Sequence, residues 1–197
     1  EYLRVFQGDT SVQAMREQLA ARLMELYRRA SAEDWPWFED QVTYCNARLP
    51  QALLLSGTSM ARADMVAVGL LSLEWLTSLQ QTPDGYFAPI GSNGFYRRGA
   101  AAARFDQQPV EACGMVSVCL DAHRITRDDR WYHHARSAFR WFLGQNHLHQ
   151  AVYDPSTGGC RDGLHADRLN ENQGAESTIS FLLALRDMHS AERADLT

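Results

Sequence analysis

An eight-residue pattern that occurs twice, and a third time in part, constrains the fold of this chain more than any other feature. The complete copies run over residues 170–177 and 105–112, and each opens an apolar segment expected to be helical. The partial copy begins at Phe38. Starts at residues 38, 105 and 170 put the copies 67 and 65 residues apart. A period of this length indicates stacked units, each long enough for a pair of antiparallel helices.

Equivalent positions of the pattern carry similar polar side chains. In order along the pattern they are Asp106 and Glu171, Gln108 and Gln173, and Glu111 and Glu176, with Glu39, Gln41 and Tyr44 in the partial copy. If alternate helices line the inside of a toroid in parallel, their equivalent ends meet at one mouth. The repeated acids are then expected to surround one concavity.

Apolar periodicity predicts an all-α chain. A first helix is expected to begin near Thr10, where Thr10 and Gln13 fit a capping box. It is expected to lie on the outside of the fold with one solvent-exposed face. Its apolar stripe consists of Val12, Met15, Leu19, Leu23 and Leu26. Further helices are expected over about 40–55 (with a kink or break at Pro50), 59–80, 109–125 and 130–145, and from about residue 172.

The expected connections alternate between short and long, and the longest ones follow residues 80 and 146. Bundles favour uniformly short connections, and long ordered loops tend to carry function. The sequence therefore predicts antiparallel helical hairpins that form an (α/α) toroid or part of one. We expect one domain over residues 1–197, as a whole protein or, given the start at Glu1, as a fragment of a longer chain.

Charge and cysteine content exclude several classes of partner. The formal net charge is −5 and no Lys/Arg cluster occurs, which argues against nucleic acid or an anionic membrane surface. No apolar run is long enough to span a membrane. The four cysteines form no C-x-x-C pair, and Cys113 and Cys119 lie inside an apolar helical run as expected of buried free thiols, which favours a reducing, cytoplasmic setting. The histidine spacings do not match a zinc site, and neither a metal nor another cofactor is expected.

The repeated acids suggest carbohydrate chemistry. Glycoside hydrolysis uses paired carboxylates, one as acid and one as base or nucleophile, and Glu111 and Glu176 are the candidates for that catalytic pair. The candidate substrate-binding residues are Glu39, Asp106, Glu171, Gln108, Gln173, Trp37, Tyr44 and Tyr86. The alternative is that each glutamate interacts with the amides and dipole of its own helix. For Trp35 and Trp37, packing in the core is the favoured interpretation.

Three blocks of this sequence resemble helical domains attached to bacterial glycosyltransferases. They are Trp35 to Glu39 with Tyr44 to Leu53, Phe105 to Ala112, and Asp162 to Leu164 with Asn170 to Thr178. The resemblance covers most of residues 34–188. It implies a six-hairpin glycosidase-like toroid, a role in carbohydrate metabolism and a cytoplasmic bacterial setting.

The partners that this resemblance implies are a carbohydrate ligand and either a glycosyltransferase module or a second copy. The chain itself shows no βαβ pattern for binding a nucleotide sugar. It also holds only about three hairpins, half of a closed toroid, so either the rest lies elsewhere or two copies meet. A non-enzymatic glycan-binding, scaffold or interaction domain is the alternative function.

Overall fold

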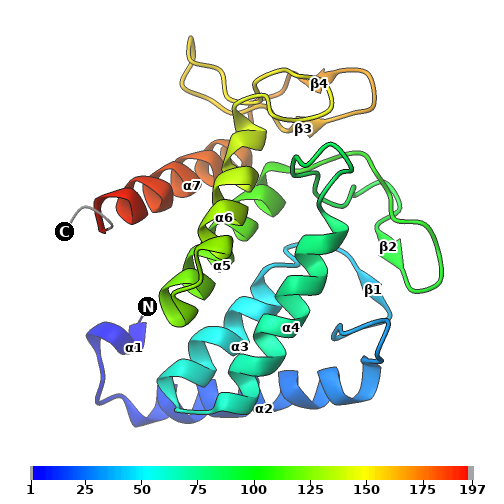
Figure 1. Cartoon of the computed structure of the whole chain (residues 1–197). Helices are drawn as coiled ribbons and strands as arrows, with labels where there is room; N and C mark the ends of the chain where they lie inside the picture. The colour runs from blue at the N-terminus through cyan, green and yellow to red at the C-terminus, as the bar shows by residue number, and fades with distance from the viewer. Residues whose placement is uncertain (1, 195–197) are drawn as a thin grey trace.

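Helices arranged as hairpins make up most of the computed structural model, which describes residues 2–194 (Figure 1). The helices are α1 (Tyr2–Val5), α2 (Thr10–Ala30), α3 (Arg48–Ser59), α4 (Ala63–Leu79), α5 (Pro109–Thr126), α6 (Asp129–Phe142) and α7 (Ala175–Ala194). Two antiparallel pairs of two-residue strands join the loops: β1 (Gln41–Val42) with β2 (Tyr96–Arg97), and β3 (Gly163–Leu164) with β4 (Leu169–Asn170). The all-α prediction is confirmed.

Short and long connections lie at opposite ends of the molecule. Residues 60–62 join α3 to α4, and residues 127–128 join α5 to α6. Both short links turn through a left-handed residue, Ala61 at φ 53° and Arg127 at φ 60°. The long segments 31–47, 80–108 and 143–174 gather at the other end (Figure 1). As a result, α3, α5 and α7 all begin at the end where the long loops lie.

Helix α5 is the centre of the packing. It contacts α3, α6 and α7, and from Glu111 to Ala122 only Ser117 is not buried. Pro109 is its first residue, as predicted, because the first turn of a helix does not need the N–H that proline lacks. The inner helices α3, α5 and α7 therefore form a continuous row.

Glycines bring α3 and α4 close together. A Cβ atom added at Gly57 would lie 2.9 Å from Cβ of Met65, and one added at Gly69 would lie 3.0 Å from Cγ of Leu54. Each glycine thus leaves room for a side chain of the facing helix. The two helices can bury Leu53, Leu54 and Leu73 completely as a result.

Aromatic side chains fill the space under β1 and β2. The rings of Trp35 and Trp75 meet edge to face at 4.8 Å, and Tyr96 and Trp37 pack against the same pair. Trp35 and Trp37 are buried, and Trp35 Nε1 donates to the carbonyl of Glu39 at 2.8 Å. The core interpretation favoured for both tryptophans agrees with this burial.

Several expected helix boundaries were wrong, and each difference has an identifiable cause. The N-cap of α2 is Asp9, whose carboxylate accepts from Val12 N at 3.1 Å, so the Thr10–Gln13 capping box does not form. The second expected helix begins at Arg48 and not near 40, because residues 41–42 pair with β2. Pro50 is the third residue of α3, where its missing N–H costs nothing, and it causes no break.

The expected helix over 59–80 begins at Ala63, because α3 continues to Ser59. The helix expected over 130–145 begins one residue early at Asp129, after the N-cap Asp128, and ends at Phe142. The last helix begins at Ala175 rather than near residue 172.

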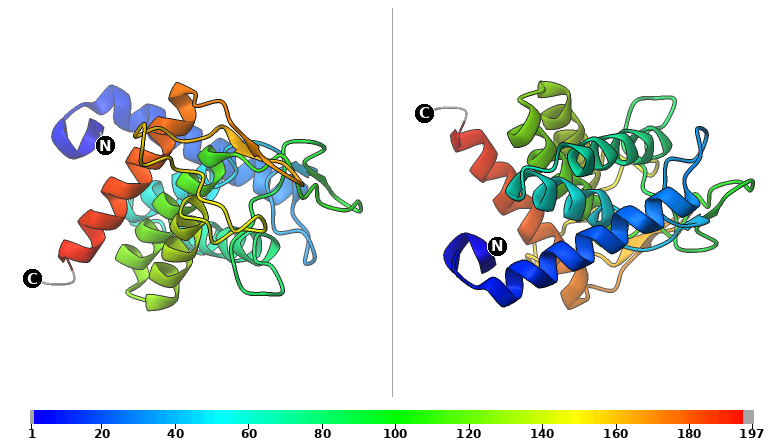
Figure 2. Two further views of the ribbon diagram at one scale, coloured as in Figure 1. Left: turned by 90° about the horizontal axis from the view of Figure 1, so that it is seen from above. Right: turned by 90° about the horizontal axis from the view of Figure 1, so that it is seen from below.

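Helix α2 crosses below α3 and α4 (Figures 1 and 2). It presents Ala20 and Met24 to the body, both of them buried. The expected stripe lies to one side of this contact, since Met15, Leu19 and Leu26 are exposed. The small side chain of Ala20 offers a close approach that a leucine at this position would not. Much of the predicted stripe is therefore uncovered.

Candidate functional site

The starts of α3, α5 and α7 meet where the long loops gather, and we call this region the mouth. It consists of residues 44–46, 105–112 and 161–177. Hydrogen bonds between residues far apart in sequence tie these segments together. The geometry of each acid at the mouth determines what it can do chemically.

Glu111, in the first turn of α5, is buried beneath the segment that leads into α3. It is only 2% exposed. Its carboxylate accepts hydrogen bonds from the backbone N–H of Cys45 and of Asn46, and from the side-chain amide of Asn46 at 3.2 Å. Burial raises the pKa of Glu111, and these donors partly offset the effect. Glu111 thus fixes the approach to a neighbouring helix and does not cap its own.

Glu176, at the equivalent position of α7, is exposed and meets a phenol. The hydroxyl of Tyr44 donates to Glu176 Oε1 at 2.6 Å. Burial raises the pKa of Tyr44, and the hydrogen bond to Glu176 raises it further, so the phenol keeps its proton at neutral pH. Tyr44 is itself 44% exposed. This pair offers a donor and an acceptor to a ligand at the surface.

Both glutamates therefore converge on adjacent residues. Glu176 contacts Tyr44, and Glu111 contacts Cys45 and Asn46. Cys45 adopts a left-handed conformation at φ 53°, which turns the chain between the two acids. Burial, and then the charge of Glu111, raise the pKa of the Cys45 thiol, so it does not behave as an activated thiolate.

Asp162, directly before β3, accepts hydrogen bonds from residues at the start of α7. Its carboxylate accepts from Gly174 N at 2.8 Å and from Ser177 Oγ at 2.6 Å, and Asn172 also donates to it. Burial alone would raise the pKa of Asp162, but the hydrogen bonds from Ser177, Gly174 and Asn172 lower it overall. Because a loop residue caps the helix, Glu176 is left free to face Tyr44.

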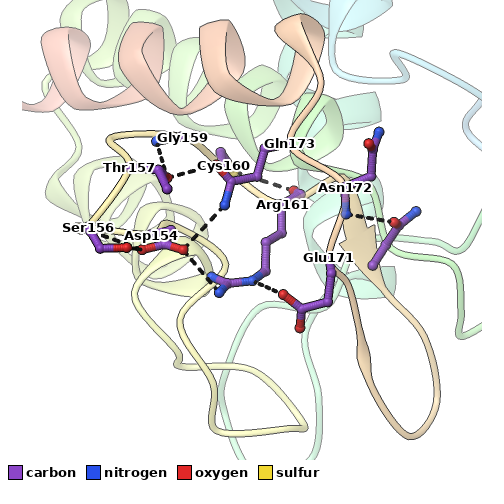
Figure 3. Close-up of polar contacts among 10 residues, drawn as sticks. Asp154, Ser156, Thr157, Gly159, Cys160, Arg161, Glu171, Asn172 and Gln173 are labelled. Carbon is purple, nitrogen blue, oxygen red and sulfur yellow. Dashed lines mark hydrogen bonds and ion pairs between the residues drawn. The ribbon is translucent and has the colours of Figure 1, made fainter.

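Glu171 and Gln173 belong to a polar network that extends from the mouth into the loop 154–161 (Figure 3). Arg161 donates to Glu171 at 2.8 Å and to Asp154 at 3.2 Å, so the guanidinium bridges two acids. Gln173 donates to Asp154 at 3.3 Å and accepts from Thr157 at 2.7 Å. These contacts hold the loop 154–161 against the segment that precedes α7.

Asp106 forms a pair that the sequence analysis missed. Its Oδ1 accepts from Nδ1 of His165, in the turn between β3 and β4, and both side chains are partly exposed. Gln107 next to it exchanges backbone hydrogen bonds with Leu164, which brings the two loops into register. The histidines occur next to each other or at irregular spacings, so their pattern did not indicate this pair. To find it, one would have had to predict that residues 107 and 164 pair as residues of two strands do.

Of the other predicted residues, Gln108 lies in the mouth, whereas Glu39, Tyr86 and Trp37 lie outside it. Gln108 is half-buried directly before α5, and Glu39 is exposed near β1. Tyr86 is half-buried in the turn after α4, where its backbone N–H bonds to Thr82 Oγ1. Trp37 is fully buried, which leaves its ring no exposed face for a sugar.

A cavity of about 1370 Å³ lies between the row of inner helices and the N-terminal part of the chain, from which Tyr2, Gln13 and Arg16 line it. Polar groups of α3, α5 and α7 line it, among them Arg48, Gln51, Asp121 and Asp187. Gln51 donates to Asp121 at 2.7 Å and accepts from Arg48 at 2.6 Å. Neither Glu111 nor Glu176 lines this cavity, so both acids lie at the mouth and outside the cavity.

Within residues 2–194 no group of three or more His, Cys, Asp and Glu side chains is placed to hold a metal ion. The cysteines are free thiols. Burial raises the pKa of Cys160 to about 12 and also raises those of Cys113 and Cys119. None of the helices over 2–194 is both long and apolar enough to cross a membrane.

The arrangement of inner and outer helices is that of an (α/α) toroid, of which this chain forms a part. A similar structure is the GH76A alpha-1,6-mannanase from Salegentibacter sp. HEL1_6, with a TM-score of 0.58 and 13% sequence identity over 89% of this chain. The chain spans 54% of the mannanase's length, about half. At this identity the likeness shows the fold alone. No protein-family profile and no curated protein sequence matches the chain.

Proposed function

We propose that this chain is the glycan-binding part of a carbohydrate-acting toroid domain and that its ligand binds at the mouth. The observation that carries the proposal is the exposed pair of Tyr44 and Glu176 at the point where three inner helices begin. A carboxylate beside a neutral phenol presents an acceptor and a donor, which suits the hydroxyl groups of a sugar. The similar fold of the mannanase supports a carbohydrate as the ligand.

The two glutamates take different roles in this proposal. Glu176 contacts the sugar, because it is exposed and a hydroxyl holds it from one side only. Glu111 is a positioning residue that holds residues 44–46 in place. If the domain also hydrolyses glycosides, Glu111 is the general acid, since burial raises its pKa as such a role requires.

Of the remaining predicted residues, Asp106 and His165 extend the site along the mouth. The partly exposed imidazole, held by Asp106, offers a second donor or acceptor. Glu171 and Gln173 act through the loop that they fix, together with Arg161. A linked glycosyltransferase module and a cytoplasmic setting belong to the same proposal and rest on the three sequence blocks within residues 34–188.

The second candidate function is that the domain binds a glycan without catalysing any reaction, and one observation favours it. Glu111 is 2% exposed and both of its oxygens already accept hydrogen bonds from Cys45 and Asn46. A group held in this way protonates a leaving group only if residues 44–46 move. In this case the chain binds a glycan and releases it unchanged.

Ligand-observed NMR tests the proposal directly. The wild-type chain is titrated with α-1,6-linked manno-oligosaccharides first, then with other oligosaccharides and nucleotide sugars. We expect binding that Glu176→Gln and Tyr44→Phe weaken about tenfold, which corresponds to about 1.4 kcal/mol. Glu192→Gln, an exposed glutamate on the same helix but far from the mouth, is the matched control and keeps full affinity.

The same samples separate the two candidates. Release of reducing sugar by the wild type, abolished in Glu176→Gln or Glu111→Gln, establishes hydrolysis. Binding without any turnover establishes the glycan-binding domain. If the wild type is folded and binds none of these ligands, or if both mouth variants bind as well as the wild type, the proposed site is wrong.

A further inference from the structure

The cavity between the inner helices and the N-terminal part of the chain is positively charged, although the chain as a whole is acidic. Four arginines and two aspartates are among the residues that line it, which is a surplus of two positive charges. The formal net charge of the whole chain is −5. The arginines come from four different helices: Arg16 from α2, Arg48 from α3, Arg124 from α5 and Arg186 from α7. The fold thus gathers positive charge around one cavity.

Two of these arginines are paired with an acid of their own helix. Arg124 Nη2 donates to Oδ1 of Asp121, and Arg186 Nη2 donates to Oδ1 of Asp187 at 2.7 Å. Asp121 and Asp187 are the two aspartates that line the cavity. The surplus of positive charge therefore belongs to the other two arginines.

Arg16 and Arg48 are held by uncharged oxygen atoms. Arg48 Nη1 donates to Gln51 Oε1 at 2.6 Å, and Arg16 Nη1 donates to Ser59 Oγ at 2.7 Å. Neither arginine forms an ion pair with an acid among the side chains that the structure describes. Each guanidinium is therefore fixed in place while no contacting acid neutralises its charge.

Arg16 also has an unused hydrogen-bonding edge. Nη1 contacts Ser59, and the edge formed by Nε and Nη2 has no acceptor among the described residues. The side chain is half-buried, and its Nε is completely buried without a partner. A buried donor without a partner is costly, so such a group in a folded protein needs an explanation. An oxyanion supplies one, because the edge with two donors matches the geometry of a phosphate or carboxylate group.

We propose that the cavity binds a small molecule with a phosphate or carboxylate group and that Arg16 holds this anionic group. Ser59 orients the guanidinium from its other side. Ser59 is the last residue of α3 and Arg48 is the first, so these residues are about 16 Å apart along the helix axis. Arg48 therefore attracts the anion through its charge and does not hold the same group.

The rest of the ligand lies along α3 between these two ends. The hydroxyl groups of Ser56 and Ser117 line this part of the cavity and are available to polar groups of the ligand. The volume of about 1370 Å³ exceeds that of a usual small-molecule site, about 300–1000 Å³. Tyr44 and Glu176 do not line the cavity, so this site is separate from the one proposed at the mouth.

Isothermal titration calorimetry of the 197-residue chain tests the proposal with inorganic phosphate, glucose 6-phosphate and glucuronate as probes. Uncharged glucose is the counterpart of the two sugar anions. We expect at least one anion to bind more tightly than glucose, and its affinity to fall as salt is added, since the contact is between charges. Binding of the two phosphates without glucuronate identifies a phosphorylated ligand, and the reverse identifies a carboxylate.

Variants of Arg16 locate the site. Arg16→Gln should weaken the binding of the anion about tenfold or more, because both the charge and the two-donor edge are lost. Arg16→Lys should recover only part of the loss, since it keeps the charge and not the edge. Arg48→Gln should weaken binding less than Arg16→Gln does. Arg22→Gln is the matched control, because Arg22 is an exposed arginine of the same helix that does not line the cavity.

Circular dichroism confirms that the variants are folded, and three results would overturn the inference. The first is a folded wild type that binds none of the three anions. The second is an affinity that Arg16→Gln leaves unchanged or that Arg22→Gln lowers equally. The third is an affinity that Glu176→Gln abolishes and Arg16→Gln preserves, which would place the anion at the mouth.

Discussion

The starts of α5 and α7 share a sequence pattern but differ in how their acids are held. At α5, Glu111 is buried and accepts from two backbone N–H groups before α3. At α7, Glu176 is exposed and accepts from one phenol. Glutamate at the same position of the repeated pattern is therefore buried against the neighbouring segment in one copy and exposed in the other.

Neighbouring helices explain the difference. Helix α5 lies between α3 and α7, so its first turn is covered on both sides, whereas α7 has an inner neighbour on one side. The chain before α5 also offers few free donors, since Pro109 has no N–H and Gln107 N is already bonded to Leu164. Glu176 consequently reaches past α5 to the hydroxyl of Tyr44.

The largest expected effect on stability comes from removing the acid at the start of α5. Replacing Glu111 by alanine leaves the backbone donors of Cys45 and Asn46 and the Asn46 amide without their acceptor. We expect a loss of about 3 kcal/mol in the free energy of unfolding, because buried donors without a partner are costly. Urea unfolding followed by circular dichroism measures it. A loss below about 1 kcal/mol would show that water or another acceptor replaces the carboxylate.

The cap of α7 gives the next largest effect. Asp162→Ala removes the acceptor for Gly174 N and Ser177 Oγ, and we expect a loss of about 1–2 kcal/mol in unfolding free energy. Gly174→Ala should act in the same direction, since its Cβ would lie 2.8 Å from Asp162 Oδ1. Urea unfolding of both variants checks this. If both are as stable as the wild type, α7 does not depend on this cap.

Glu111 and Asp162 should change the stability of the fold with pH in opposite directions. Burial raises the pKa of Glu111 when folded, so its stabilising contribution is complete below its unfolded pKa and is lost as pH rises through the raised value. Burial acts to raise the pKa of Asp162, but hydrogen bonding lowers this pKa overall in the folded chain. The stabilising contribution of Asp162 is therefore present above the pKa of the unfolded chain and is lost as pH falls through the lowered pKa of the folded chain.

Unfolding free energies measured over about pH 3 to 8 check both signs. With rising pH, the wild type should lose stability relative to Glu111→Gln and gain stability relative to Asp162→Asn. Parallel curves for the wild type and either variant would mean that the substituted group titrates alike in the folded and unfolded chains.

The smallest expected effect on stability belongs to Glu176. Glu176→Ala removes one exposed hydrogen bond, and the Tyr44 hydroxyl can bond to water instead, so we expect a change within about 0.5 kcal/mol. Urea unfolding beside Glu111→Ala sharpens the comparison between the two helix starts. Equal losses in the two variants would contradict the assignment of a structural role to Glu111 alone.

Much of the fold could be predicted from local patterns in the sequence. The apolar periods located the main helices, Pro109 located the start of α5, and loop composition located the long connections. Some of the differences come from near neighbours, such as Asp9 at the start of α2, and others from distant residues. Asp162 caps α7 from a loop, and strand β2 pairs with residues that looked like the start of a helix.

The candidate site was predictable only in outline. The repeat indicated that Glu111 and Glu176 belong to equivalent helix starts, and the structure places both next to residues 44–46. Burial of Glu111 depends on the helices around it, which no local pattern reports. The pairing of Asp106 with His165 spans 59 residues and depends on two loops whose conformation has no periodicity.

The unequal connections also bear on the order of folding. α3 with α4 and α5 with α6 are joined by three and two residues, so these pairs close with little loss of chain entropy. The contact between Glu111 and Cys45 spans 66 residues and forms only when distant parts of the chain have met. The short-linked pairs should therefore form first and the mouth last. In native-state hydrogen exchange, amide protons in residues 44–46 should exchange through smaller openings than those in the middle of α5.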